Sequence, residues 1–170
     1  MLSTPYLCKS ESSIMKKQKY TLEEALDKLE AYCAKQERST AQIRKKCWGW
    51  GIYGDEAEEL ISELILANFL SEERFAEAYV RGKFRMNRWG KQKIRQGLQQ
   101  HEVSEYNIRS ALSGIPPKEY QEVLHQLAAE KERLLPKGLN TYERKNKITR
   151  YLLQKGYTYA DIKQVVQQGN

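Results

Sequence analysis

Little in this sequence suits catalysis, metal binding or a disulfide framework. Its 170 residues include two histidines and three cysteines, and Cys8, Cys33 and Cys47 form no CxxC pair. A structural zinc site takes four thiolate or imidazole ligands close together, and residues this few and this scattered do not predict one. An odd number of widely spaced cysteines indicates reduced thiols, which are typical of a cytoplasmic protein. We therefore expect no metal and no disulfide.

Motifs of cofactor binding and nucleophilic catalysis are also missing. The sequence has no Gly-rich phosphate loop, no HExxH, no GxSxG and no DxDxDG loop. Neither His101 nor His125 has a nucleophile or an orienting carboxylate at a telling spacing. No apolar run approaches the length of a membrane span, and the polar residues 1–19 predict a flexible tail and not a signal peptide. We expect a protein that is not an enzyme, has no cofactor and does not bind a membrane.

Proline and strand-like alternation are scarce, which leaves long segments free to form helices. The prolines are Pro5, Pro116, Pro117 and Pro136, and the chain from Tyr20 onward has a helical hydrophobic period. Residues suited to begin a helix are Thr21, Ser39, Asp55, Ser71, Ser104, Asn140 and Thr158. These signals predict an all-α protein with about nine helices, near residues 22–36, 40–49, 55–67, 72–88, 91–101, 105–113, 117–135, 141–155 and 159–168.

Three similar groups of helices follow one another. Ile43, Ile94 and Ile148 each begin an apolar pair spaced four residues apart, with a basic residue one or two places later. The groups repeat at offsets of 51 and 54 residues. A period of this size predicts a tandem array of three-helix modules, each with a small core of its own. We expect an elongated and curved array of three modules, at 20–68, 69–115 and 116–170, with joints at 68–71 and 114–117.

Positive charge is concentrated in the second of these modules. Between residues 74 and 101 the chain has eight basic residues and one acid, Glu77. The basic residues are Arg74, Arg81, Lys83, Arg85, Arg88, Lys91, Lys93 and Arg95. Residues 55–73 are the opposite, with seven acids and no Lys or Arg, although several of these acids lie near predicted helix starts and suit the helix dipole there. The dense cationic excess predicts a surface that binds a polyanion, because binding releases counterions.

Helical geometry sharpens this prediction into a stripe. On a helix over 72–88, four arginines would share one narrow face, and two cations would continue it on the next helix. These are Arg74, Arg81, Arg85 and Arg88, followed by Lys91 and Arg95. A charged helix face is usually only a solvated surface. That interpretation predicts acids interspersed among the cations, and Glu77 is the one acid in this segment. Arginine also suits phosphate, since its planar guanidinium donates two parallel hydrogen bonds.

Aromatic residues and a second basic cluster extend the candidate surface. Trp89, between the two helices, is a candidate for stacking on a base, whereas Tyr79 fits core packing better. Trp48 and Trp50 are expected to close the core of the first module. A weaker cluster in the third module adds Lys145, Lys147 and Arg150 to the candidate contacts.

The amino-acid sequence of two segments is more specific evidence than the distribution of charge. Residues 68–80 read NFLSEERFAEAYV, and residues 147–157 read KITRYLLQKGY, with Tyr159-Ala160-Asp161-Ile162 after them. Together with residues 81–98, these segments resemble the signatures of the RecX family, the regulators of the RecA recombinase. The resemblance extends over residues 22–168 and is looser in the first module. A Lys-Gly pair usual in the family is His101-Glu102 in this chain.

The resemblance implies an all-helical array of three-helix modules that binds along the groove of the RecA–ssDNA filament. It implies inhibition of recombinase, ATPase and coprotease activity, and so an effect on homologous recombination, DNA repair and the SOS response. It also implies some direct affinity for DNA, single-stranded first and double-stranded second. We expect a monomer.

Two other functions fit the residues by themselves. One is a freestanding helical protein that binds DNA or RNA without a recombinase, since three-helix units also occur in helix-turn-helix regulators. The other is a scaffold that joins two proteins through the acidic and basic patches.

Overall fold

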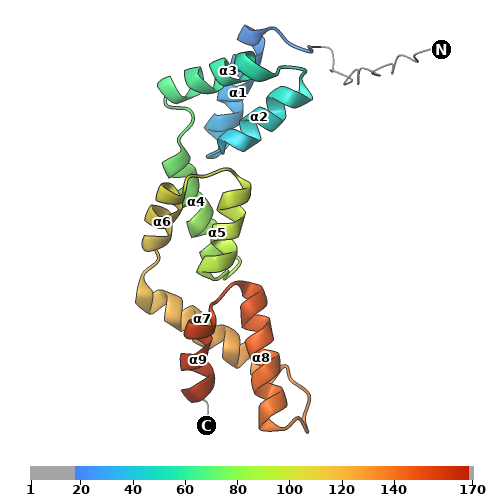
Figure 1. Ribbon diagram of the computed structural model, residues 1–170, viewed down its shortest axis with the longest axis vertical. Helices are drawn as coiled ribbons and strands as arrows, with labels where there is room; N and C mark the ends of the chain where they lie inside the picture. The colour runs from blue at the N-terminus through green and yellow to red at the C-terminus, as the bar shows by residue number, and fades with distance from the viewer. Residues whose placement is uncertain (1–17, 169–170) are drawn as a thin grey trace, which may run out of the picture.

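The protein is an all-helical array, seen in a computed structural model that describes residues 18–168, with side chains described to residue 166 (Figure 1). That part of the chain has nine α-helices and no strand. They are α1 (Leu22–Lys35), α2 (Thr40–Gly49), α3 (Gly54–Leu66), α4 (Glu72–Arg85), α5 (Lys91–Gln100), α6 (Glu105–Ser113), α7 (Pro117–Arg133), α8 (Thr141–Lys155) and α9 (Tyr159–Gln168). The predicted fold class is confirmed. The predicted flexible tail lies outside the described residues except at its end, where the Lys19 amide donates to the Trp50 carbonyl at 2.8 Å.

Short polar side chains begin most of these helices, as predicted. Thr21, Ser39 and Asn140 each form a capping box with the residue three places on. Thr158 does the same with Asp161 at the start of α9. The prediction for Asp55 is wrong, because α3 begins at Gly54 and Asp55 lies inside its first turn.

Helix α4 ends three residues earlier than predicted. The Arg88 amide donates to the Phe84 carbonyl and the Trp89 amide to the Lys83 carbonyl, a pattern that closes a helix with a residue in the left-handed region. That residue is Arg88, at φ 53°. Glycine usually takes this position, so the sequence lacked the signal that marks the end of the helix.

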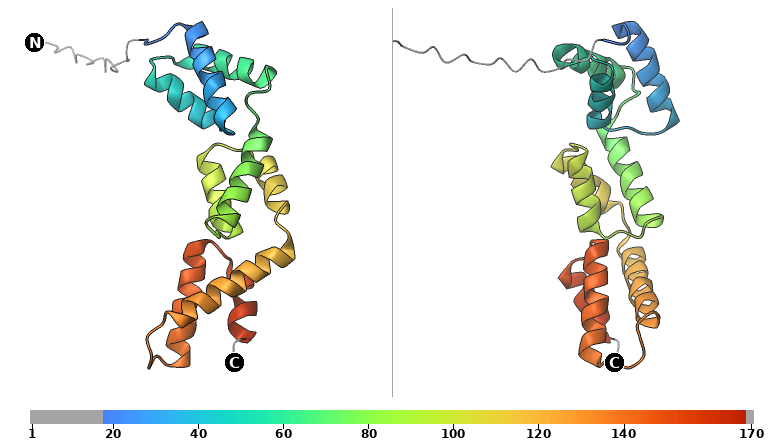
Figure 2. Two further views of the ribbon diagram at one scale, coloured as in Figure 1. Left: turned by 180° about the vertical axis from the view of Figure 1, so that it is seen from behind. Right: turned by 90° about the vertical axis from the view of Figure 1, so that its right-hand side faces the viewer.

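The helices pack in consecutive triplets along the length of the molecule. In the first triplet α1 and α2 pack on α3, and in the second α4, α5 and α6 pack on one another. Helices α7, α8 and α9 form the third triplet. The triplets follow one another down the long axis, so the molecule is elongated and its described ends lie at opposite poles (Figures 1 and 2).

The buried side chains form two clusters. One lies within residues 25–70, and the other runs without interruption through the second and third triplets, from Phe75 to Val165. The expectation of a separate core in each module is therefore wrong for the last two. Short helices in small triplets leave much apolar surface uncovered, and a shared core buries more of it. No helix in the described part of the chain is long and apolar enough to cross a membrane.

The two junctions between triplets differ in chemistry. The first is polar: Arg44 pairs with Glu102 at 2.6 Å, and Arg74 with Glu37 at 2.9 Å. The second shares the apolar core and adds a contact of main chain on main chain, in which the Gly90 amide donates to the Lys155 carbonyl at 2.8 Å. The second and third triplets therefore approach each other more closely there than a contact between side chains would permit.

Candidate nucleic-acid interface

Four of the five arginines of the predicted stripe pair with carboxylates from other elements, and Arg81 does not. Arg74 pairs with Glu37 and also donates to the side chain and carbonyl of Asn68. Arg95 pairs with Glu105 of α6. Arg85 has Glu119 of α7 at 3.9 Å. The prediction that Glu77 alone could neutralise these cations is wrong, because acids distant in sequence lie beside them in the fold.

Arg88 does not lie on the stripe at all. It follows α4 in the left-handed conformation, and its two terminal nitrogens donate to the two Glu130 carboxylate oxygens at 2.8 and 3.0 Å. This bidentate pair raises the pKa of the Arg88 guanidinium and lowers the pKa of the Glu130 carboxyl. Arg88 thus joins the second triplet to α7.

The lysines of the same region are differently placed. Lys83 of α4 and Lys93 of α5 hold their ammonium groups 5.0 and 4.7 Å from the ring centroid of Trp89, within cation–π range. Lys155 of α8 reaches the main chain two residues before Trp89, with its ammonium 3.5 Å from the carbonyl of Asn87. We call Trp89, Lys83, Lys93 and Lys155 the Trp89 cluster. None of its three lysines has a carboxylate within 4.0 Å among the described residues.

Lys155 is a member of this cluster that sequence reasoning did not place there. It closes α8, far along the chain from Lys83 and Lys93, and charge was its only signal. The fold brings it there because the end of α8 rests against the start of α5, where the Gln92 amide donates to the Gly156 carbonyl at 3.1 Å. Two ammonium groups over one indole, with a third at the carbonyl of nearby Asn87, form a cationic site suited to a phosphate.

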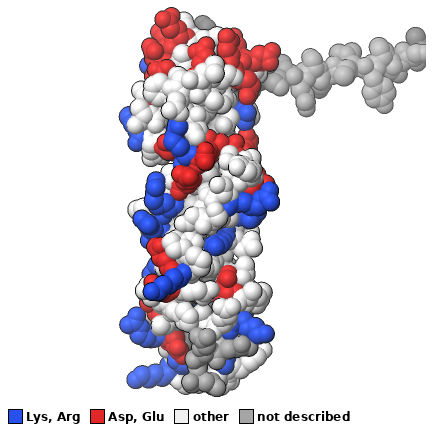
Figure 3. All heavy atoms as spheres, turned by 90° about the vertical axis from the view of Figure 1, so that its left-hand side faces the viewer, with Lys and Arg blue, Asp and Glu red and all other residues white. Residues whose placement is uncertain are grey.

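The remaining candidates are spread over several faces. Arg81 is exposed on α4, and the Lys91 ammonium lies 5.0 Å from the ring centroid of Tyr120. On α8, Lys147 and Arg150 are exposed, whereas Lys145 lines a groove against α7 and α9. On the face shown in Figure 3, acidic side chains gather on the first triplet, and basic ones, with some acids between them, extend over the second and third.

The aromatic predictions had mixed outcomes. Tyr79 is half-buried against Phe75 and His101, and this burial raises the pKa of its hydroxyl, as expected of a residue that packs on the core. Trp50 packs on the first cluster beside Tyr20. Trp48 is 65% exposed, so the prediction that it closes this core is wrong.

The residues that the structure describes at this surface do not include a cluster of metal ligands. In the described part of the chain, no three His, Cys, Asp or Glu side chains group in a way that could hold a metal ion. Cys33 and Cys47 are buried free thiols, and burial raises the pKa of each. A thiol with a raised pKa is a weak nucleophile at neutral pH.

Comparison with models of protein families identifies two of the three triplets. The family model of the second three-helix domain of RecX matches residues 71–112, and that of the third matches residues 118–166. Together these matches cover more than half of the chain. The chain belongs to the RecX family.

Individual RecX proteins are similar to this chain in sequence. The regulatory protein RecX of Clostridium botulinum (strain Alaska E43 / Type E3) is 35% identical over 132 residues, which are 77% of this chain and 61% of the relative. That of Lactococcus lactis subsp. lactis (strain IL1403) is 30% identical over 125 residues, 72% of this chain and 46% of the relative. This chain thus spans less than two thirds of the length of these relatives.

A solved structure of RecX from Lactobacillus salivarius superposes with a TM-score of 0.78 at 23% identity, covering 86% of this chain and 95% of that one. This likeness shows a common fold. Within the matched RecX domains, the Trp89 cluster draws Lys83, Trp89 and Lys93 from the second and Lys155 from the third. The cluster therefore lies at the junction of two RecX domains.

Proposed function

We propose that this RecX-family protein is a non-enzymatic regulator that binds the RecA–ssDNA filament in the cytoplasm. Bound there, it lowers the recombinase, ATPase and coprotease activities of RecA, and so modulates homologous recombination, DNA repair and the SOS response. The observation that carries this proposal is the match of residues 71–112 and 118–166 to the second and third RecX domains.

The Trp89 cluster is the part of the surface that best suits contact with filament DNA. Its lysines have no carboxylate within 4.0 Å among the described residues, and the charges of Lys83 and Lys93 in particular are available to phosphate. The arginines that pair with Glu37, Glu130 and Glu105 serve chiefly to hold triplets and helices together. We therefore place the nucleic-acid contact on lysines, with Arg81, Lys147 and Arg150 as exposed secondary contacts.

An elongated array suits a partner that repeats along an axis. A protein whose triplets follow one another can contact more than one protomer of a filament, and such a bridge opposes the movements between protomers that accompany ATP turnover. The second and third triplets share a core, so they would act in this bridge as one unit.

The decisive experiment follows ATP hydrolysis by RecA on single-stranded DNA. Adding the purified protein to preformed filaments should slow hydrolysis in proportion to its concentration. Unchanged hydrolysis at every ratio up to saturation of the filament would refute the proposal.

One observation favours a second candidate, a freestanding nucleic-acid-binding protein. Lysines around an indole form a surface that binds single strands without any recombinase. Binding to an oligonucleotide alone, at the same affinity as to the RecA filament, would favour this function over the first.

A further inference from the structure

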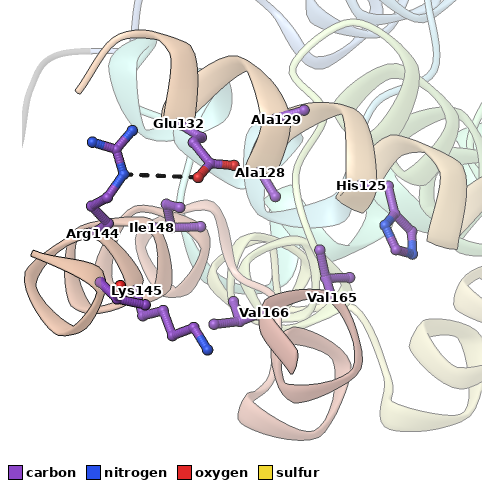
Figure 4. Close-up of a pocket in the computed structure, with 10 residues that line it drawn as sticks. His125, Ala128, Ala129, Glu132, Arg144, Lys145, Ile148, Val165 and Val166 are labelled. Carbon is purple, nitrogen blue, oxygen red and sulfur yellow. Dashed lines mark ion pairs between the residues drawn. The ribbon is translucent and has the colours of Figure 1, made fainter. Parts of the chain in front are cut away.

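A groove on the third triplet is separate from the Trp89 cluster. It lies between α7, α8 and α9 and has a volume of about 570 Å³ (Figure 4). Its floor is apolar, made by Ala128, Ala129, Ile148, Val165 and Val166. Its polar lining is His125, Glu132, Thr141, Arg144 and Lys145. An apolar floor within a polar rim is the form of a site that takes an amphipathic segment.

The rim of this groove is cationic once its internal pair is considered. The Glu132 carboxylate faces the Arg144 guanidinium, with Oε1 and Nε 3.9 Å apart, so the two charges largely neutralise each other (Figure 4). Lys145 also lines the groove and has no carboxylate within 4.0 Å among the described residues. The free charge at the rim is therefore positive.

Two large apolar side chains are exposed near the same ends of α7 and α8. Leu134 follows α7 and is 79% exposed, and Tyr142 in the first turn of α8 is 75% exposed. Both lie within two residues of the lining residues Glu132 and Thr141. Large apolar side chains that stay exposed on a monomer favour a surface of this triplet that a partner covers.

We propose that this groove docks an acidic, amphipathic segment of another protein. Apolar side chains of that segment would lie on the floor, and its carboxylates would face Lys145 and the solvent-exposed rim. The parts of this chain that lie outside the described residues have no acidic segment: residues 1–17 have three lysines and one glutamate, and residues 169–170 have no charged side chain. A nucleic acid would find a single unpaired cation over an apolar floor, a poor match to a row of phosphates.

The test uses the full chain and a dye-labelled synthetic peptide of about fifteen residues, with leucine on one helical face and glutamate on the others. Fluorescence anisotropy should rise on titration with the protein, without RecA or DNA. A peptide with the same leucines and glutamine in place of glutamate should bind at least about tenfold more weakly. No binding of the acidic peptide, or equal binding of the two, would overturn the proposal.

Two variants with a close control locate the site. Lys145→Glu reverses the free charge, and Ala129→Glu places a carboxylate on the exposed part of the floor; each should weaken peptide binding by about tenfold. Lys147→Glu makes the same charge change on the same helix outside the groove, and should leave affinity within about twofold. Equal weakening by Lys145→Glu and Lys147→Glu would mean nonspecific attraction and overturn the proposal.

Two other occupants of the groove, a second copy of the chain and a nucleic acid, would each give a different experimental result. Sedimentation that shows a dimer dissociated by Ala129→Glu would assign the groove to a second copy of the chain. Abolished oligonucleotide binding in Lys145→Glu would assign it to nucleic acid. Either result overturns the proposal. Because the peptide assay contains no recombinase, its outcome is independent of the proposed effect on RecA.

Discussion

The main chain of Gly90 rests directly on that of Gly156. A Cβ atom at position 90 would lie 2.3 Å from both the carbonyl carbon and the carbonyl oxygen of Gly156. At this contact the Gly90 amide donates to the Lys155 carbonyl and the Gln92 amide to the Gly156 carbonyl. Gly156 is itself in the left-handed region, at φ 94°. The second and third triplets are therefore joined at a point where any side chain would separate them.

The first prediction concerns this contact. Gly90→Ala should lower the free energy of unfolding by about 1–3 kcal/mol, because the added methyl group meets backbone that cannot move aside. Urea unfolding followed by circular dichroism measures the change. Gly82→Ala is the matched control, since a Cβ in the last turn of α4 meets nothing within 4 Å, and it should stabilise by about 0.5–1 kcal/mol. A Gly90→Ala protein as stable as the parent would contradict the packing at this junction.

The second prediction concerns the Trp89 cluster. Lys83→Glu combined with Lys93→Glu should raise the concentration needed to slow the RecA ATPase by about tenfold, because two unpaired cations become anions. Direct binding to single-stranded DNA should also become less dependent on salt. The log–log slope should fall in magnitude by about 0.7 for each phosphate that the variant no longer neutralises.

The control for this double change is Lys35→Glu with Lys163→Glu, two exposed lysines outside the cluster. It alters net charge equally and should have little effect on either assay. If both pairs reduce inhibition alike, net charge alone would explain the effect, and the cluster would have no special role.

The third prediction concerns Glu102, which occupies a position that suits glycine. Its φ is 60°, and Gly51 and Gly156 take the corresponding place after α2 and α8. Glu102→Gly should relieve about 1 kcal/mol of backbone strain, but it also removes the exposed ion pair with Arg44. The two effects separate in an Arg44→Ala background, where Glu102→Gly should stabilise by the full amount. Destabilisation in that background, measured by urea unfolding, would show that the left-handed turn is not strained.

The fourth prediction concerns pH and His101. Its ring packs edge-on to Phe75 and Tyr79, and its Nδ1 lies 3.3 Å from the Ser39 hydroxyl. Burial lowers the pKa of His101, and the nearby Lys83 ammonium lowers it further. The unfolded chain, in which the histidine pKa is about 6.5, then takes up this proton more readily than the folded protein.

The contribution of His101 to folding stability should therefore be fully present above about pH 6.5. It should be lost as the pH falls from about 6.5 through the folded pKa of His101. His101→Gln should lack this part of the pH dependence, as seen by comparing urea midpoints of the two proteins from about pH 5 to about pH 7. Parallel midpoints across that range would contradict a lowered pKa. Acidic groups that also titrate there affect both proteins equally and cancel in the comparison.

Local signals account for the success of the helix predictions. Capping by Thr21, Ser39 and Asn140 depends on neighbours within three residues, so it is visible in the sequence directly. The early end of α4 escaped prediction because Arg88 replaces the glycine that would mark it. The number and order of the helices, and their repetition in threes, follow from patterns of this local kind.

The candidate site was less accessible to sequence reasoning, because the partner of a charge is not a local property. Arg88 and Lys93 are equally cationic in the sequence. Arg88 nevertheless finds Glu130 in α7, whereas Lys93 finds the face of Trp89. A stripe calculated from one helix could not include acids supplied by another.

Hydrophobic period, helix caps and composition act within a few residues, so the helices, their order and the excess of positive charge in the second module could be inferred from the chain alone. The folded arrangement was needed to learn which cations are neutralised and that the second and third triplets share one core. It was also needed to bring Lys155 of α8 to the carbonyl of Asn87, next to the second triplet. These features depend on contacts between residues far apart in the chain, and such contacts form only when burial of apolar surface brings the helices together.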